Sequence, residues 1–291
     1  MSPAGTVRIG ISGWTYAPWR GNFYPPGLLH ADELSYASRQ VDTIEINGTF
    51  YGLQRPDAFA RWHDETPENF VFAVKGPRFI THIRRLREVE TPLANFFASG
   101  VLRLEEKLGP VLWQFPASFR FSPERLDQFF ALLPRDTEAA TALAERRSEW
   151  FADRAWAKTG QRRELRHAIE IRHQSFLDPA FVVLLRRHRV ALVFADSVAW
   201  PYAEDVTADF VYLRLHGSEE LYASGYSDEA LDHFAARIKL WAAGLEPNDA
   251  RRVTPETGPA RAEARDVFVY FDNDAKVRAP VDARSLRARL P

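Results

Sequence analysis

The amino-acid sequence predicts a single (β/α)8 barrel, and three observations support this. Eight short apolar segments recur along the chain, and each ends in charged or amide residues. Helical periodicity fills most of the gaps between them, so strand and helix alternate. The length of 291 residues suits one barrel of about 250 residues with insertions. The predicted strands lie within residues 8–14, 43–47, 70–75, 110–115, 167–173, 191–196, 210–216 and 267–273.

The segments between the strands carry ordinary start signals for helices. Thr91, Ser122 and Asp178 each precede a proline, which is the usual order of an N-cap and a first-turn residue. An acidic first turn follows Ser227 and favours the helix dipole. We therefore expect helices over about 31–39, 56–63, 91–108, 122–133, 136–158 and 227–243, with another beginning at Asp178.

Three connections are expected to be irregular within the one domain, residues 1–291. An aromatic loop with Pro25, Pro26 and Gly27 follows the first strand. The connection 197–208 is too short for a full helix. Residues 246–265 are rich in Pro, Arg, Glu and Ala and lack periodicity, so we expect a mobile surface insertion before the last strand.

The composition excludes several classes of function. The chain has no cysteine, which rules out disulfides, thiolate catalysis and cysteine-bound metal. A net charge of −1 gives no general attraction to nucleic acid or to acidic membranes. We see no signal-peptide pattern and no apolar run long enough to span a bilayer, so we expect a cytoplasmic protein without a membrane partner. No glycine-rich fingerprint supports a dinucleotide cofactor.

Polar residues alternate with aliphatic residues at the ends of the predicted strands. Ile44 and Ile46 share one face of their strand, and Glu45 shares the other face with Asn47. Because the aliphatic face must meet the helices, the polar face points into the barrel, at the end where such barrels carry their sites. The side chains expected at this mouth are Glu45, Asn47, Lys75, Gln114, Glu170, Arg172, Asp196, Arg214, His216 and Asp272.

Buried charges at this mouth allow more than one interpretation. One is a network of ion pairs in which Glu45 and Glu170 hold Arg172 and Arg214 for structural reasons. Another is an anion-binding site, in which Lys75 and the two arginines hold a phosphate or carboxylate. The flat walls for a sugar or a base would come from Trp14, Tyr16, Tyr51 and Tyr226, and His82 could reach the mouth from its loop.

Eight motifs resemble those of a known family. They are GISGWTYAPWRGNFYP, TIEINGTFY, FAVKGPRFITH, LGPVLWQFPASF, AIEIRHQSF, VYLRLHG, YSDEAL and VYFDNDA. Together they are similar to the YecE-like family, the domain-of-unknown-function family numbered 72, over about residues 8–283. The resemblance implies a (β/α)8 barrel without a known activity, and it adds Asn273 to the candidate ligand-binding residues. Asp272 stands where the family more usually has Asn.

We expect an enzyme of hydrolase or lyase type that acts on a phosphate- or carboxylate-bearing sugar or nucleotide-type ligand. Glu170, His216 and Asp272 are the candidate catalytic groups, since their surroundings can separate their pKa values. Two alternatives stay open, namely a non-catalytic ligand-binding barrel and a metal-dependent, endonuclease-like phosphoesterase that binds nucleic acid. No cofactor is expected, and no HExxH motif supports a metal site. A divalent metal stays open as an alternative, because the carboxylates and imidazoles at the mouth are possible ligands.

Overall fold

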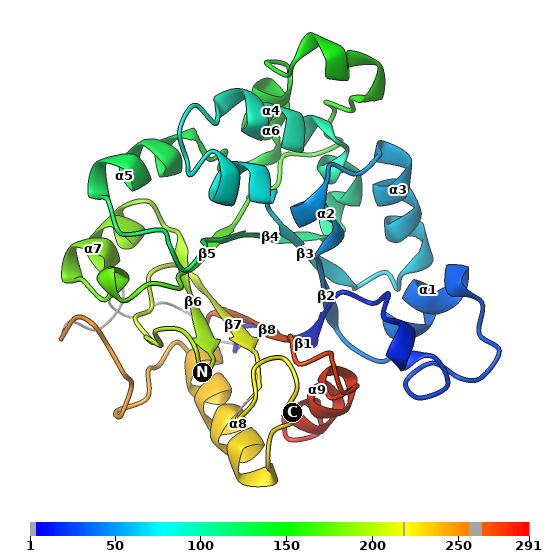
Figure 1. Cartoon of the computed structure of the whole chain (residues 1–291), viewed down its shortest axis with the longest axis vertical. Coiled ribbons are helices and arrows are strands. Elements are labelled where there is room, and N and C mark those ends of the chain that lie inside the picture. The colour runs from blue at the N-terminus through cyan, green and yellow to red at the C-terminus, as the bar shows by residue number, and fades with distance from the viewer. Residues whose placement is uncertain (1–3, 218, 256–263, 291) are drawn as a thin grey trace.

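Eight parallel strands pair in sequence order and close into a barrel, because β8 pairs with β1 (Figure 1). This computed structural model describes residues 4–217, 219–255 and 264–290. All eight predicted strands are present, which confirms the (β/α)8 prediction. The strands are β1 (Val7–Ser12), β2 (Thr43–Ile46), β3 (Val71–Lys75), β4 (Leu108–Gln114), β5 (His167–Glu170), β6 (Ala191–Asp196), β7 (Phe210–Leu215) and β8 (Asp266–Phe271).

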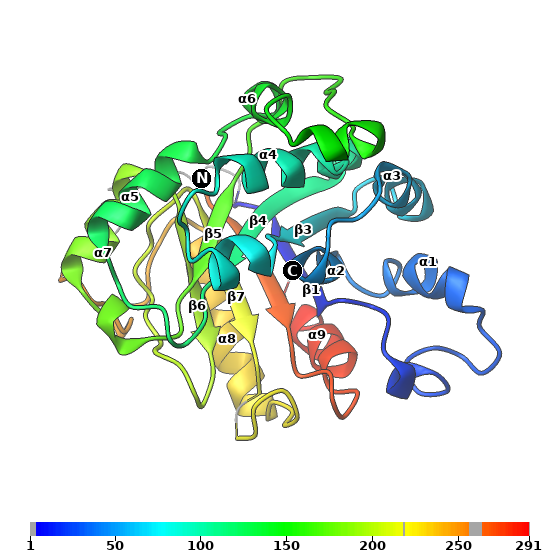
Figure 2. The same ribbon diagram turned by 45° about the horizontal axis from the view of Figure 1, so that its top comes forward.

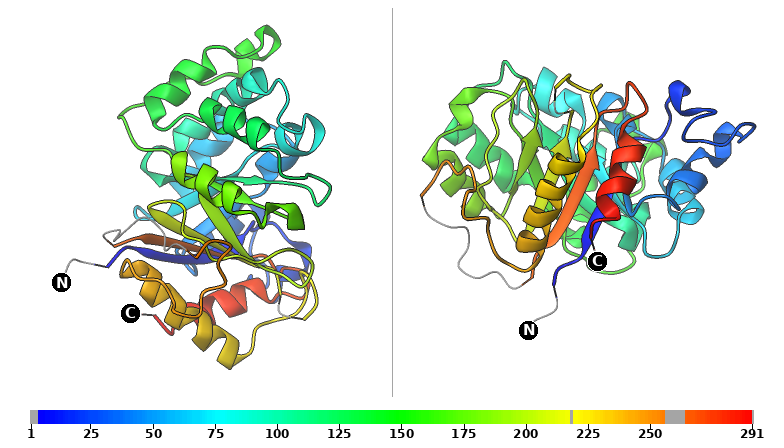
Figure 3. Two further views of the ribbon diagram at one scale, coloured as in Figure 1. Left: turned by 90° about the vertical axis from the view of Figure 1, so that its left-hand side faces the viewer. Right: turned by 90° about the horizontal axis from the view of Figure 1, so that it is seen from below.

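Helices surround the barrel on its outside (Figure 2). The last two helices lie side by side along β8 and close the ring near β1 (Figure 3). The helices are α1 (Glu33–Ala37), α2 (Gly48–Tyr51), α3 (Pro56–Glu65), α4 (Glu90–Ala98), α5 (Pro123–Leu132), α6 (Thr137–Ala144), α7 (Pro179–Arg187), α8 (Asp228–Ala242) and α9 (Ala279–Arg287). Shorter 3-10 and π turns are η1 (Ala17–Trp19), η2 (His30–Asp32), η3 (Phe79–Ile83), η4 (Val101–Lys107), η5 (Glu149–Arg154) and η6 (Gln174–Phe176).

The alternation of side chains along each strand builds two apolar layers. Outward residues such as Ile44 and Ile46 join the large core between strands and helices. Inward residues form a second cluster inside the barrel, where Tyr270 meets Thr43 across 2.9 Å between their hydroxyl oxygens. The inward cluster includes Ala73, Leu112, Ala168, Ala191, Val193, Ala195, Tyr212 and Phe268. The period of two thus assigns the faces of β2, β7 and β8 as predicted.

Two predicted helices are shorter than their apolar stripes suggested. The helix expected over 91–108 ends at Ala98, because Gly100 turns the chain with a φ of 106° before η4 begins. The helix expected over 136–158 divides into α6 and η5, and Ser148 between them is tied to Asn95 by a bond of 2.8 Å from its backbone N–H. In both cases apolar residues on either side of the break still pack into the core, although the helix is interrupted.

Of the two irregular connections in the second half of the chain, one agrees with the prediction and the other is more closely packed than expected. Residues 197–209 contain no helix, as predicted. The segment 246–265 was expected to be a mobile insertion, but its described first part is tied to buried Asp205, which accepts hydrogen bonds from the backbone N–H groups of Val253 and Thr254 at 2.7 and 3.1 Å. Residues 256–263 of that segment lie outside the described residues. Among the helices that the structure describes, none has the length and apolar character to cross a membrane.

Replacing Gly100 with Ala should destabilise the protein by about 2–4 kcal/mol, since the positive φ disfavours a side chain and a Cβ would lie 2.4 Å from Cα of Pro56. Urea denaturation measures the change. Gly52→Ala is the matched control, because its φ is −167° and an added Cβ meets nothing within 4 Å. The packing account fails if both variants unfold at the same urea concentration.

Candidate functional site

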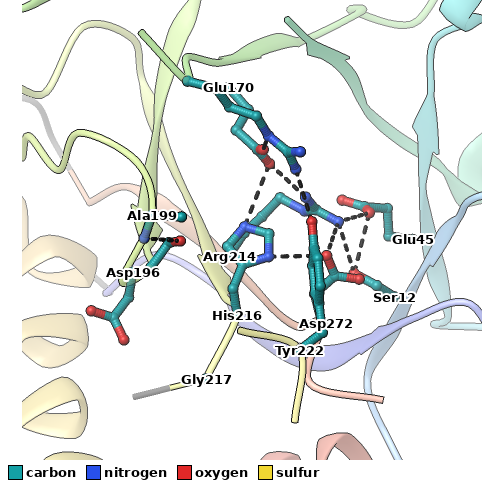
Figure 4. Close-up of polar contacts among 12 residues, drawn as sticks. Ser12, Glu45, Glu170, Asp196, Ala199, Arg214, His216, Gly217, Tyr222 and Asp272 are labelled. Carbon is teal, nitrogen blue, oxygen red and sulfur yellow. Dashed lines mark hydrogen bonds and ion pairs between the residues drawn. The ribbon is translucent and has the colours of Figure 1, made fainter. Parts of the chain in front are cut away.

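Arg214 lies at the centre of the barrel mouth and contacts three carboxylates from three other strands (Figure 4). Its Nη2 is 2.8 Å from Oε1 of Glu45 and 2.9 Å from Oδ2 of Asp272, and its Nη1 is 2.5 Å from Oε2 of Glu170. The arginine is fully buried. Such a charge is tolerated inside a protein only when good geometry and further hydrogen bonds surround it.

Further polar groups hold the carboxylates on either side of Arg214. The hydroxyl of Tyr212 donates to Oε2 of Glu45 at 2.6 Å, and Ser12 Oγ donates to Oε1 at 3.2 Å. Ser12 on β1 and Tyr212 on β7 both point into the barrel, as Glu45 does on β2. Glu45 therefore has partners at both oxygens, and its position is fixed before any ligand arrives.

Glu170 is held between two arginines. Arg172 donates from Nε to its Oε1 at 2.7 Å, while the guanidinium of Arg172 lies 3.6 Å from the ring centroid of Trp200. Nη2 of Arg172 also donates to the hydroxyl of Tyr222 at 3.3 Å. Burial would raise the pKa of Glu170, but the two arginines outweigh it and hold that pKa well below the usual value.

His216 lies next to the carboxylates that Arg214 gathers. Its Nδ1 is 3.0 Å from Oδ2 of Asp272, its Nε2 is 3.7 Å from Oε2 of Glu170, and its ring meets that of Trp200 edge-on with centroids 5.0 Å apart. Neither ring nitrogen makes a hydrogen bond within the described residues. The imidazole is thus close enough to exchange a proton with Asp272 after a small rotation.

A cavity of about 590 Å³ opens above this cluster, at the C-terminal ends of β1, β2, β3 and β8. We call Asn47, Lys75 and Asp272 its polar floor. Its walls are largely aromatic, with the side chains of Trp14, Tyr16, Tyr51, Trp62 and Tyr222. The volume and the mixed lining fit a small molecule with both polar groups and flat apolar faces.

Lys75 brings an amine to the floor without a partner. Its side chain is 8% exposed, and within the described ranges its Nζ makes no hydrogen bond or ion pair. The Nζ lies 4.6 Å from the ring centroid of Phe50. Burial, and next the charge of Arg214, lower the pKa of Lys75 to about 8. A substantial share of this amine is therefore neutral near physiological pH.

Asp272 and Asp274 titrate in opposite directions although they are two residues apart. Burial would raise the pKa of Asp272, but Arg214 outweighs it and holds that pKa well below its usual value. Burial, and next the charge of Asp272, raise the pKa of Asp274 well above its usual value. Asp272 is thus ionised at neutral pH, while Asp274 holds its proton more strongly than an ordinary aspartate. Pairs separated in this way are typical of acid–base sites.

Comparison with known proteins identifies the family. Residues 8–291 match the family described as "Protein of unknown function DUF72". The chain belongs to the DUF72 family. The UPF0759 protein YecE of Escherichia coli K12 is 29% identical over 144 residues, which cover 43% of this chain and 50% of YecE. YunF of Bacillus subtilis is 26% identical over 158 residues, which cover 53% of this chain and 55% of YunF. The chain thus matches about half the length of these curated relatives.

Solved structures of DUF72 proteins share the fold. One from Thermotoga maritima has a TM-score of 0.69 at 23% identity, and the match covers 97% of this chain and 98% of that chain. One from Enterococcus faecalis has a TM-score of 0.68 at 18% identity, with 98% of this chain and 95% of that chain covered. At these identities the likeness shows the barrel alone.

The predicted site residues of this DUF72 barrel divide into two groups. One group is gathered around Arg214 or along the cavity. The others lie elsewhere or at its edge. The gathered residues are Trp14, Tyr16, Glu45, Asn47, Tyr51, Lys75, Glu170, Arg172, Arg214, His216 and Asp272. Gln114 faces inward beside Glu170, its register partner on β5, and its buried Oε1 has no hydrogen-bond partner within the described ranges.

Asp196 was predicted to lie at the mouth of the barrel, but it does not reach it. Its neighbour Ala195 occupies the inward face of β6, so the carboxylate of Asp196 points away from Arg214 (Figure 4). It accepts a hydrogen bond from the hydroxyl of Tyr226 at 2.7 Å. Tyr226 in turn packs against Phe271 with ring centroids 5.8 Å apart and does not line the cavity.

Two further predicted residues have local partners. Nδ2 of Asn273 donates to the backbone carbonyl of Ser224 at 2.9 Å and to Oδ2 of Asp282 at 2.8 Å, which fits a structural role for this residue. His82 lies in η3, where its Nδ1 is 2.8 Å from Oγ1 of Thr81. Neither residue is among those that line the cavity.

The direct anion-binding role predicted for Arg214 does not fit its surroundings. Its guanidinium is fully buried and contacts three carboxylates, so no face of it is open to a ligand. It acts instead as the cation at the centre of the cluster. In the part of the chain that the structure describes, no group of three or more His, Asp or Glu side chains is arranged to hold a metal ion.

Sequence reasoning missed several residues of this site. Tyr212 shares the inward face with Arg214, and Ser12 ends β1, so the strand alternation carried a signal for both. Asp274 follows the last predicted strand in a motif that was already noted. Trp200 and Tyr222 come from irregular connections after β6 and β7, where no periodicity indicates which side chains turn toward the mouth.

Replacing Arg214 with Met should destabilise this DUF72 barrel by about 3–5 kcal/mol at pH 7, because three buried carboxylates lose their cation. Arg61→Met is the control, since Arg61 forms an exposed pair with Glu65 and its loss should change little. Urea denaturation at several pH values measures both.

The destabilisation by Arg214→Met should shrink as the pH falls. In the wild type the pKa values of Glu170 and Asp272 lie below their ordinary values of 4.5 and 3.8. Their stabilising contribution is therefore complete above those values and is lost as the pH falls toward the folded pKa values. In the variant, burial without Arg214 favours the protonated carboxylates. A deficit that is equal at pH 7 and pH 4 would contradict this account.

Proposed function

We propose that this DUF72 barrel is an enzyme of hydrolase or lyase type that acts on a small, sugar-like ligand bearing a phosphate or carboxylate. The observation that carries the proposal is the cavity itself. Its floor joins an unpaired amine, Lys75, to an ionised carboxylate, Asp272, beneath aromatic walls. Flat rings suit the faces of a sugar, and the floor offers both signs of charge to its polar groups.

The anionic part of the ligand is supported by a group of cations beside the cavity. Burial, and next the charges of Arg172, Arg78 and Lys75, lower the pKa of His82 to about 4. The three cations that lower this pKa make the region near η3 locally positive. Arg172 is 14% exposed, so part of its guanidinium can meet a ligand even though Glu170 and Trp200 hold it in place. A phosphate or carboxylate fits this region by charge.

Acid–base chemistry falls to Asp272 and its neighbours. Asp272 lines the cavity as an ionised carboxylate, which suits a general base. His216 stands behind it at 3.0 Å and can receive the proton. Glu170 has both oxygens bound by arginines and lies 3.7 Å from His216, so we assign it to positioning. This revises the catalytic role expected for Glu170.

Asp272→Asn should abolish turnover while leaving binding nearly intact, with a loss of about 10²–10⁴-fold in rate. Sugar phosphates, uronic acids and nucleoside monophosphates are first screened by thermal shift, where a ligand at 100 times its Kd adds about 2.7 kcal/mol of stability. Mass spectrometry then follows conversion of every ligand that binds.

Asp196→Asn is the matched control, because this carboxylate also ends a strand but bonds to Tyr226 away from the cavity. It should leave turnover unchanged. Ligands that bind and are recovered unchanged with the wild type would favour a binding protein over an enzyme. Equal losses in the two variants would remove Asp272 from the reaction.

A further inference from the structure

We propose that Lys75 forms a covalent imine with its substrate, which narrows the substrate class to anionic aldehydes and ketones. The inference rests on the proposed function and deepens it toward the lyase alternative. An imine needs an amine that faces a cavity, is free of strong partners and has acid–base groups nearby. Lys75 meets each condition.

The amine of Lys75 is free in a way that the other buried lysine is not. Nζ of Lys107 donates to the backbone carbonyls of His63 at 2.6 Å and Thr66 at 2.9 Å and to Oγ1 of Thr66 at 3.3 Å, so its three protons all have acceptors. Lys75 has no such bond within the described ranges and lies on the cavity floor. Burial in this manner holds an amine ready for reaction with a bound carbonyl.

Two residues with amide side chains lie at the ends of the strands that neighbour β3. Asn47 follows β2 and Gln114 ends β4, and both strands pair with β3, which Lys75 ends. Oδ1 of Asn47 and Oε1 of Gln114 are buried and lack hydrogen-bond partners within residues 4–217, 219–255 and 264–290. A buried acceptor without a donor is costly, and Asn47 lines the cavity, so a bound group with O–H or N–H donors would be stabilised beside it. The hydroxyl and N–H of a carbinolamine are such donors.

The ion-pair cluster explains why Lys75 has no carboxylate partner. Glu45, Glu170 and Asp272 are the carboxylates whose charges act on Lys75, and all three are bound to Arg214. Arg214 also repels the ammonium form. Burial, and next the charge of Arg214, outweigh the three carboxylates and lower the pKa of Lys75 to about 8. About 10% of Lys75 is then neutral at pH 7, about 200 times the share of an ordinary lysine.

The covalent step balances with groups already at the site. The lone pair of neutral Nζ attacks the carbonyl carbon, the C=O π bond breaks, and its electron pair passes to oxygen. Asp272, with His216 at 3.0 Å as its relay, carries the two N–H protons one after the other from nitrogen to this oxygen. The first transfer gives a neutral carbinolamine, and the second lets the hydroxyl leave as water while the nitrogen lone pair forms the C=N bond. No oxidant or reductant is consumed.

The test is reductive trapping with glycolaldehyde and pyruvate, one small neutral aldehyde and one anionic ketone. The wild-type protein is incubated with each compound and cyanoborohydride at pH 7, and peptide mass mapping measures the adduct at every lysine. The reduced adduct adds the mass of the probe less one oxygen. The chain has only five lysines, and exposed Lys158, Lys239 and Lys276 serve as internal references.

We expect labelling of Lys75 at least about tenfold above the exposed lysines, with half of its maximum near pH 8. Lys75→Arg keeps a positive charge without a nucleophilic amine, so it should lose this adduct alone. Lys107→Met, the matched buried variant, should keep it. Labelling of Lys75 no greater than that of the exposed lysines would overturn the imine.

Thermal-shift binding separates this proposal from the broader one. If anionic ligands stabilise both the wild type and Lys75→Arg, and no adduct forms at Lys75, the imine is wrong and the anionic ligand site stands. If neither binding nor adduct occurs, both proposals fall. An adduct at Lys75 that forms faster with pyruvate than with glycolaldehyde, relative to the exposed lysines, supports both.

Discussion

The contact of Arg214 with three carboxylates is the interaction on which the site depends. A guanidinium without exposure would be costly if any of Glu45, Glu170 and Asp272 were missing, and each carboxylate would be costly without it. The cluster fixes the ends of four strands relative to one another. It also leaves Lys75 without a carboxylate partner, so the same contact that stabilises the mouth makes an amine available there.

Much of the site follows from the period of two along the strands. The segment AIEIR sets aliphatic residues against Glu170 and Arg172, and the contrast between its faces is enough to place both inside the barrel. The segment ALVFAD has apolar residues on both faces and gives no such contrast, so its final Asp196 was assigned to the wrong side. Face assignment fails where a strand is apolar throughout.

The upper parts of the site were harder to predict because loops carry them. Trp14, Tyr16 and Tyr51 were found as aromatic residues next to strand ends, and the structure places them along the cavity. Trp200 and Tyr222 come from connections without periodicity, so their contacts with Arg172 depend on tertiary structure alone. The break at Gly100 was masked by an apolar stripe that continued past it. DUF72 membership explains the barrel, but the chemistry must be argued from these side chains.

The central claim is that Arg214 holds Asp272 ionised, while burial and the charge of Asp272 raise the pKa of neighbouring Asp274. NMR titration of the aspartate carboxyl carbons tests this most directly. The account predicts that Asp272 titrates below the ordinary value of about 3.9 and that Asp274 titrates well above it. Two carboxyl groups that both titrate at the ordinary value would contradict it.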